Sequence, residues 1–426
     1  MANNFDSNIT QKLARTFLEP FDTDRVISKN VNTQLLSGQF NPASGDTVSF
    51  KRPTDYTSTR TSDGDISGGT ANSIITGKAS GVVQDMFSVE LDWNTVDQAL
   101  KMDQLEELIA PAARRIVTDM EVDFAAFAMK NTALLAGDVG TAVGSANDAW
   151  DDVAGAGAIM QASGVPMDNS WCYFANPFTQ RKLASNQRSL GGETGSMSAN
   201  QRAVITENFA GLKVMTANTL PTYTTGTGAD RAGTLSGTPT ATYLAAKDTM
   251  TMSIAVTAFQ ANLVVAAGET ITVTGRNRLN LSTRQPIIDE TGAEILFSGT
   301  VTASVTLGAS GEGTLVITGP AIYEATGAYN TVDSALTSGD VVTLGGAAST
   351  LIQPNLFWHK QAFAIGSVPI PKLYSTDTIA TTKDGLQIRV SKGASIRENK
   401  QIVRFDLLPA YACLNPFFAG QGFGVA

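Results

Sequence analysis

The side chains that carry acid–base, nucleophilic and metal chemistry are scarce in this chain of 426 residues. It holds one histidine, His359, and two cysteines, Cys172 and Cys413. Histidine exchanges protons near neutral pH, and histidine and cysteine are the usual zinc ligands. We interpret His359, which follows Phe357 and Trp358, as a packed structural residue, and the distant cysteines as buried free thiols in a reducing compartment. These features disfavour zinc, haem and cysteine-nucleophile sites.

Motifs for phosphate binding, hydrolysis and calcium binding are incomplete or missing. The glycine-rich residues 191–196 (GGETGS) lack the lysine and hydroxyl pair of a P-loop, so we interpret them as a loop tip. The chain has no Gly-x-Ser-x-Gly elbow, so a serine hydrolase would depend wholly on His359. Asp63, Gly64 and Asp65 lack the alternating acidic positions and closing glutamate of an EF-hand, and we predict a turn there.

Two further clusters have ordinary structural interpretations. Asp103, Glu106 and Glu107 could supply paired carboxylates, but on a helix they are typical of a solvated face. Met250 and Met252 alternate with threonines and are predicted to lie on the inner face of a strand. No residue is therefore a candidate for catalysis, cofactor binding or metal binding, and we expect neither an enzyme nor a cofactor.

The charged share of the chain is low, at 16% against about 25% in typical proteins. The formal net charge is -9 and Lys and Arg form no long basic run, which disfavours tight nucleic-acid binding but leaves a local basic face open. The first residues lack a signal-peptide pattern, and no apolar run reaches about 18 residues. We expect a soluble protein, cytoplasmic when made, whose weakly charged surface suits contact with other protein.

The first ninety residues predict an arm followed by a long hairpin. Residues 8–17 favour a short helix and residues 25–36 an irregular arm. Residues 46–52 alternate as a strand until Pro53, and residues 82–93 favour a second strand. The polar segment between them is rich in Thr, Ser, Gly and Asp, and is longer than the connections usual in compact domains. We predict a hairpin that reaches away from the body.

The strongest helical pattern follows the hairpin. Apolar residues recur at three- and four-residue intervals from Leu105 to Phe127. Pro111 interrupts this pattern, and proline is disfavoured inside a helix but suited to a first turn. We therefore predict one helix over residues 94–109 and a second, roughly 30 Å long at 1.5 Å per residue, over residues 111–133.

The remaining chain predicts an α/β part interrupted by a β domain. Residues 151–163 and 177–185 favour helices, and residues 171–174 and 211–215 favour strands. Residues 222–349 are rich in threonine and contain short alternating runs, which is typical of a β-barrel or β-sandwich of domain size. These runs are residues 251–257, 269–274, 294–306 and 314–318. Mixed sequence then resumes, with residues 385–390 as a strand, so the β domain is predicted to be an insertion.

Short motifs accompany this order of elements. They are residues 45–53 (GDTVSFKRP), 64–68 (GDISG), 104–111 (QLEELIAP), 115–119 (RIVTD), 372–373 (KL) and 404–411 (RFDLLPAY). With the arm, hairpin, long helix and α/β segment, they resemble the major capsid protein of tailed double-stranded DNA bacteriophages, the Hong Kong 97 fold. The inserted β domain narrows the resemblance to P22-type coat proteins, although inside it only residues 268–273 (GETITV) look familiar.

The resemblance implies an α+β fold of the Hong Kong 97 type with six parts. These are an N-terminal arm (1–45), an E-loop hairpin that lies over a neighbouring subunit (46–93), a P domain with its spine helix (94–138), an A domain (139–221), an inserted barrel-like I domain (222–349), and a return to the A and P domains (350–426). Lys51 and Lys78 flank the hairpin, but no matching acceptor is evident, so we do not predict a lysine–asparagine crosslink.

The implied function is self-assembly into an icosahedral shell that encloses a phage double-stranded DNA genome, through a scaffold-dependent precursor that expands on maturation. The implied partners are copies of the chain in hexamers and pentamers with triangulation number seven, a separate scaffolding protein, a portal protein and loosely held packaged DNA. Decoration proteins are left open, and no membrane is expected. The chain would be a virion component assembled in the host cytoplasm.

Two other classes of protein stay open on the residues alone. A secreted or surface carbohydrate-binding protein could have a similar threonine-rich β domain, although its export would require a signal or a leaderless route. An enzyme is the third class, which a sedimentation measurement would separate from a shell protein.

Overall fold

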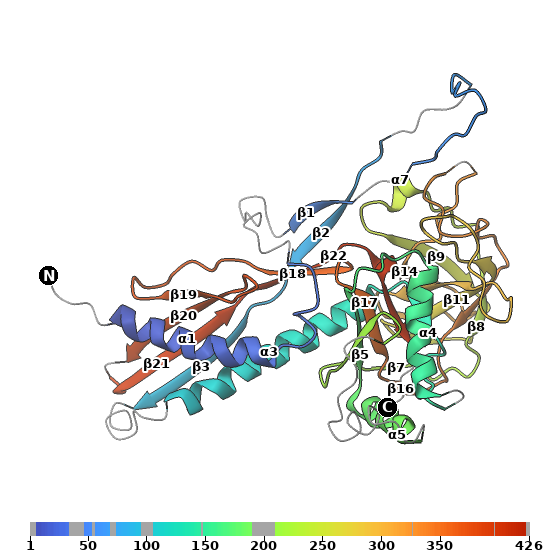
Figure 1. Ribbon diagram of the computed structural model, residues 1–426. Coiled ribbons are helices and arrows are strands. Elements are labelled where there is room, and N and C mark those ends of the chain that lie inside the picture. Colours follow the sequence, from blue (N-terminus) through green and yellow to red (C-terminus); the bar gives the residue numbers. More distant parts are fainter. Residues whose placement is uncertain are drawn as a thin grey trace. The chain divides into compact units, whose positions relative to one another are not determined.

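The computed structural model describes residues 6–33, 47–52, 56–68, 74–94, 105–145, 148–189, 209–325, 327–395 and 397–422 (Figure 1). The chain forms two compact units, each assembled from separate segments. Unit 1 comprises Met1–Val48, Gly81–Ala125 and Phe363–Ala412; unit 2 comprises Ser49–Ser80, Ala126–Ala362 and Cys413–Ala426. No helix within the described ranges is both long and apolar enough to cross a membrane.

Unit 1 is built on an antiparallel sheet covered by helix α1 (Asp6–Asp24). The strands of this sheet follow the order β19 (Thr378–Thr381), β20 (Gln387–Ser395), β21 (Lys400–Leu407) and β3 (Phe87–Asn94). The Phe17 ring stacks on Phe405 at a centroid distance of 4.3 Å, and both are fully buried. Apolar burial continues to Phe21, which explains why α1 extends beyond the predicted residues 8–17.

Helix α3 (Leu105–Lys130) passes through Pro111 without a break, so the predicted division at this residue is wrong. Proline removes one hydrogen bond, here to the carbonyl group of Glu107. Both residues are exposed near the helix start, where water can satisfy that carbonyl group. Ile109, Ile116 and other apolar residues at helical spacing are buried, as predicted. Residues 95–104 of the predicted first helix lie outside the described residues.

The predicted second hairpin strand, residues 82–93, is two strands in two sheets. One sheet has the order β1 (Thr47–Arg52), β2 (Gly77–Val83), β22 (Pro409–Cys413) and β18 (Phe363–Ser367). Residues 84–86 separate β2 from β3, because β2 pairs with β22 whereas β3 pairs with β21 along its length. The connection between β1 and β2 is described at residues 56–68 and 74–76 and contains no helix or strand there. We call these residues the hairpin segment.

Unit 2 contains a mixed sheet with helices, as predicted for the α/β part. Its strands are ordered β4 (Leu134–Ala136), β23 (Ala419–Gly422), β17 (Asn355–His359), β5 (Trp171–Ala175) and β6 (Leu212–Thr216). Its helices are α4 (Ala149–Ala162), α5 (Pro177–Ser189) and the short 3-10 helix η4 (Pro416–Phe418). Every residue of β5 and β17 is buried, so these central strands form the core of the sheet.

The threonine-rich segment of unit 2 forms a closed barrel, which decides between the predicted barrel and sandwich. The barrel order is β11 (Thr270–Asn277), β12 (Leu296–Val301), β14 (Gly313–Thr318), β9 (Thr251–Thr257), β8 (Ala232–Leu235) and β15 (Val341–Leu344). Helix α7 (Tyr243–Ala246) and the two-residue strands β10 (Val264–Val265) and β13 (Val305–Thr306) accompany it. The predicted run 294–306 is thus β12 and β13. Met252 lies on β9 and is buried in the barrel core, as predicted; Met250 is also buried in this core but lies directly before the strand.

The chain enters and leaves the barrel at neighbouring points. Strand β7 (Tyr223–Thr224) pairs with β16 (Leu351–Ile352) in an antiparallel two-stranded sheet. A domain inserted into another requires its two linkers to lie close together, and these two strands meet that requirement.

Candidate assembly surfaces

The histidine lies in a satisfied structural environment. His359 is buried on β17, and its Nδ1 accepts the Gln361 N–H at 3.1 Å. Its Nε2 lies 3.0 Å from Asp168 Oδ1, so in the neutral ring Nε2 carries the proton and donates it. Partial burial opposes ionisation of Asp168, but hydrogen bonds from Ser170 and His359 outweigh it and hold its pKa below the usual value. Both ring nitrogens are therefore used in packing this part of the sheet.

The two cysteines are free thiols. Burial raises the pKa of Cys172 to about 11 and that of Cys413 to about 12. Because the thiolate is the nucleophile and metal ligand, neither side chain is reactive at neutral pH.

The acidic candidates that the structure describes lie in a turn and on the surface. The Asp63 carboxylate accepts the Asp65 N–H at 3.1 Å, and Asp65 accepts the Ser67 N–H at 2.8 Å, which confirms the predicted turn. Glu107 is exposed. Asp103, the side chain of Glu106 and residues 191–196 lie outside the described residues. Within the part of the chain that is described, no three His, Cys, Asp or Glu residues are grouped to hold a metal.

The hairpin segment is a surface without a core. All thirteen residues from 56 to 68 are exposed. Ile66 and Ile74 expose 65% and 76% of their surface. Both apolar side chains are therefore free of packing on their own chain over most of their surface.

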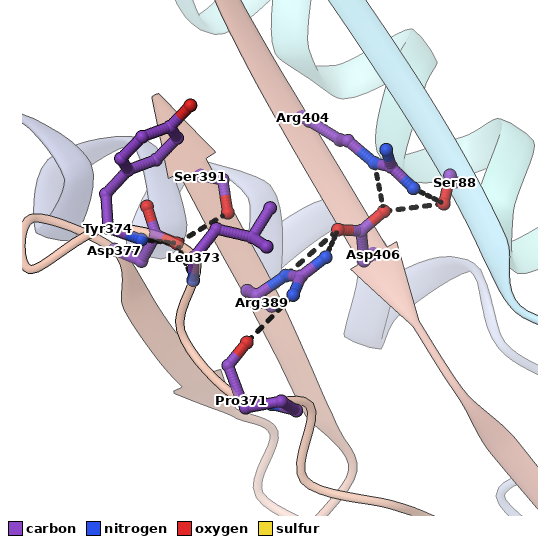
Figure 2. Close-up of polar contacts among 9 residues, drawn as sticks. All are labelled: Ser88, Pro371, Leu373, Tyr374, Asp377, Arg389, Ser391, Arg404 and Asp406. Carbon is purple, nitrogen blue, oxygen red and sulfur yellow. Dashed lines mark hydrogen bonds and ion pairs between the residues drawn. The ribbon is translucent and has the colours of Figure 1, made fainter. Parts of the chain in front are cut away.

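Unit 1 presents a second apolar feature, residues 371–377, which we call the apolar loop. Leu373 and Tyr374 expose 61% and 59% of their surface. The buried Asp377 carboxylate accepts the Leu373 N–H at 2.8 Å, the Tyr374 N–H at 3.0 Å and the Ser391 hydroxyl at 2.9 Å (Figure 2). The backbone beneath the two apolar side chains is thus fixed before any partner binds.

A buried carboxylate joins the apolar loop to the sheet beneath it. Asp406 on β21 is fully buried and accepts hydrogen bonds from Arg389 on β20, Arg404 on β21 and Ser88 on β3 (Figure 2). Arg389 also donates to the Pro371 carbonyl group at 2.8 Å. Burial opposes ionisation of Asp406, but these hydrogen bonds and the charge of Arg404 hold its pKa below the usual value. Three strands and one end of the loop therefore share one network.

The barrel is anchored to the connection between helix α3 and strand β4 through a buried arginine. Arg278 Nη2 donates to the carbonyl groups of Ala133 and Ser298, each at 2.7 Å. Burial lowers the pKa of Arg278 to about 10, which leaves it charged at neutral pH. Thr132 and Thr300 add a hydroxyl pair at 3.0 Å. No motif in the sequence singled out Arg278, Arg389 or Asp377. Arg278 and Ala133 are 145 residues apart, whereas Asp377 accepts backbone N–H groups only three and four residues away, in a turn that periodicity does not indicate.

Three comparisons place the chain among known proteins. The family model "P22 coat protein - gene protein 5" matches residues 1–424. The major capsid protein of Acyrthosiphon pisum secondary endosymbiont phage 1 is 36% identical over 428 residues, which covers all of both chains. Among solved structures, one of Mycobacterium phage Che8 is 11% identical and covers 94% of this chain and 91% of that chain, with a TM-score of 0.47. The capsid of Ralstonia phage GP4 is 8% identical and covers 93% and 88%, with a TM-score of 0.44.

Proposed function

Because the chain belongs to the P22 coat protein family, we propose a specific assembly route for it. It is a major capsid protein of a tailed phage and assembles with copies of itself into an icosahedral shell. The family assignment favours this function over the alternative hypothesis of a carbohydrate-binding protein. We infer that a separate scaffolding protein directs a precursor shell, that the shell has triangulation number seven, and that it expands on maturation. Its further proposed partners are a portal protein and packaged DNA, and decoration proteins are left open. Assembly takes place in the host cytoplasm. The chain has no catalytic role in this proposal.

The six sequence-derived parts are the proposed domains of this subunit. The paired strands β7 and β16 support an insertion that begins near residue 222 and ends near residue 349. The continuous helix α3 supports a spine for the P domain, and the mixed sheet with α4 and α5 supports the A domain. The net charge of -9 supports loose contact with DNA, because phosphate contacts need a concentration of basic residues.

The hairpin segment is the observation that carries the proposal. Ile66 and Ile74 are exposed in the single chain, and burying an isoleucine side chain stabilises a contact by about 1.5–3 kcal/mol. Residues 56–68 bury none of their own side chains, so Ile66 gains this burial on a neighbouring subunit, and the ordering of these residues and assembly are coupled. The apolar loop offers Leu373 and Tyr374 as a second contact, with its backbone already fixed.

An assembly assay with matched charge changes tests this role of the hairpin segment. Ile66→Asp replaces an exposed apolar side chain with a charge, whereas Ser62→Asp adds the same charge at an exposed polar position of the same segment. Each variant is expressed with the scaffolding protein and examined by sedimentation and electron microscopy. We expect Ile66→Asp to yield soluble subunits with few closed shells, and Ser62→Asp to assemble. Normal shells from Ile66→Asp would overturn the proposed contact.

A further inference from the structure

The base of the hairpin lies against the barrel within unit 2. Gly77, at the start of β2, is buried, and a β-carbon there would lie 2.4 Å from the carbonyl oxygen of Lys247, directly after α7. Figure 1 shows the blue hairpin strands and the yellow helix α7 in this part of the molecule. A β-carbon less than 3.0 Å from a backbone atom can be accommodated only if the backbone shifts. The two backbones therefore meet at a position that only glycine permits without such a shift.

A hydrogen bond beside Gly77 fixes the register of this contact. The Lys78 N–H donates to Asp248 Oδ1 at 3.1 Å. The Asp248 carboxylate also accepts the Lys247 ammonium group, at 3.2 Å to Oδ1 and 3.1 Å to Oδ2. The hydrogen bond from Lys247 contributes most to holding the pKa of Asp248 below its usual value, so the acceptor is ionised at neutral pH. Hydrogen bonds to an ionised acceptor are stronger than neutral ones.

A residue just before β2 adds an apolar contact, and the end of β1 is held within the same unit. Ile75, just before β2, packs against the hydrophobic core of the barrel. Arg52, at the end of β1, is buried. Its guanidinium group donates to the Cys413 carbonyl group at 3.1 Å. The segment Ser49–Ser80 accordingly clusters with unit 2.

We propose that the inserted barrel is a clasp that holds the base of the hairpin of its own chain and fixes the direction in which the hairpin segment leaves. The clasp consists of Gly77 and Lys78, held by Lys247 and Asp248 directly after α7, and of Ile75, packed against the barrel core. An element that is fixed at its base loses less conformational entropy when its tip docks, which strengthens the docked state. The clasp stands on contacts within one chain, and its consequence for assembly rests on the proposed role of the hairpin segment.

Hydrogen exchange of the unassembled chain tests the clasp directly. Gly77→Ala forces a β-carbon onto the Lys247 carbonyl group, whereas Gly68→Ala is a matched control because its β-carbon would meet nothing within 4 Å. We expect peptides that span β2 and α7 to exchange about tenfold faster in Gly77→Ala, as for an opening eased by overpacking. Exchange in barrel strands β9 and β14 stays as in the native chain. Equal exchange at β2 in both variants would overturn the clasp.

A second pair of variants keeps the test decisive if Gly77→Ala fails to fold. Asp248→Ala removes the acceptor of the Lys78 amide. Asp289→Ala is the control. It removes a similarly exposed carboxylate of the inserted segment, which accepts hydrogen bonds from its own turn, the N–H groups of Thr291 and Ala293 among them. We expect faster exchange at Lys78 only in Asp248→Ala. If both variants, or neither, alter exchange at Lys78, the proposed hydrogen-bonded contact is wrong.

An assembly assay with the scaffolding protein distinguishes failure of the clasp proposal from failure of the proposed function. The clasp variants Gly77→Ala and Asp248→Ala are expected to give fewer closed shells than Gly68→Ala. If they loosen β2 but assemble normally, the inferred consequence for assembly is overturned while the clasp stands. If Ile66→Asp assembles normally with an undisturbed clasp, the proposed hairpin contact fails instead.

Discussion

Replacing Asp406 with asparagine should destabilise unit 1 strongly. Asp406 is fully buried, and the side chain of Arg389 beside it is only 6% exposed. Removing one partner of a buried ion pair costs about 3–5 kcal/mol, because the other charge stays buried without compensation. Arg404 is 36% exposed and can turn toward water, and asparagine retains one acceptor oxygen. We therefore expect a loss near the lower limit, about 3 kcal/mol at pH 7.

The pH dependence of this loss has a defined sign. The pKa of Asp406 is below its usual value in the folded chain, so its ionised form stabilises folding above the unfolded pKa of about 4. That stability is lost as the pH falls through the folded pKa. Asparagine does not titrate, so the difference in free energy of unfolding between the two chains should be largest at neutral pH and shrink below about pH 4.

Urea unfolding of the unassembled chain measures this difference, and hydrogen exchange of β20 and β21 places it in unit 1. Asp92→Asn is the control, because Asp92 pairs with Lys400 on the same two strands, β3 and β21, at 3.0 Å, but both side chains are exposed. We expect this control to match the native chain, since exposed ion pairs contribute little. A loss below about 1 kcal/mol for Asp406→Asn, or one that does not change with pH, would refute the reasoning.

Three further predictions concern other buried groups. Glu121 is buried, and its carboxylate accepts hydrogen bonds from the N–H groups of Ile27 and Ser28. Glu121→Gln places an NH2 group opposite one of these donors, so we expect the free energy of unfolding in urea to fall by about 1–3 kcal/mol. An unchanged unfolding midpoint would contradict this. Phe297 is fully buried in the barrel, so Phe297→Ala should cost about 3–5 kcal/mol, with faster hydrogen exchange in the barrel strands and not in β20 or β21. The thiols should react with a disulfide reagent at pH 8 only after unfolding, because burial raises both pKa values to about 11 and 12; rapid labelling of the native chain would refute this.

Local periodicity predicted elements well wherever one segment decided its own structure. The three- and four-residue spacing of apolar residues such as Ile109 and Ile116 predicted the buried face of α3. The alternation at residues 251–257 matched β9 to the residue. Both patterns follow from which face of a helix or strand must be buried, and this is determined within about ten residues of chain.

The sequence-based predictions were wrong where pairing with a distant strand, or contact with solvent, decided the structure. Residues 82–93 read as one strand because their alternation is nearly continuous, but β2 and β3 pair with two different strands. Pro111 predicted a break, but the carbonyl group that loses its hydrogen bond belongs to an exposed residue, so the helix continues. Neither a pairing partner nor the solvent exposure of a carbonyl group can be obtained from local pattern.

The sequence by itself determined the family resemblance and the fold class, and predicted an inserted β domain and no catalytic residue, because composition, periodicity and short motifs are properties of the chain. Only the tertiary structure decided three hydrogen bonds. Arg389 donates to Asp406, Arg278 donates to the Ala133 carbonyl group, and the Lys78 N–H donates to Asp248. These partners are 17, 145 and 170 residues apart. Such pairs form only after the elements that carry the two partners have packed together. For Asp406 and Arg278, burial also removes the water that would otherwise satisfy the charge.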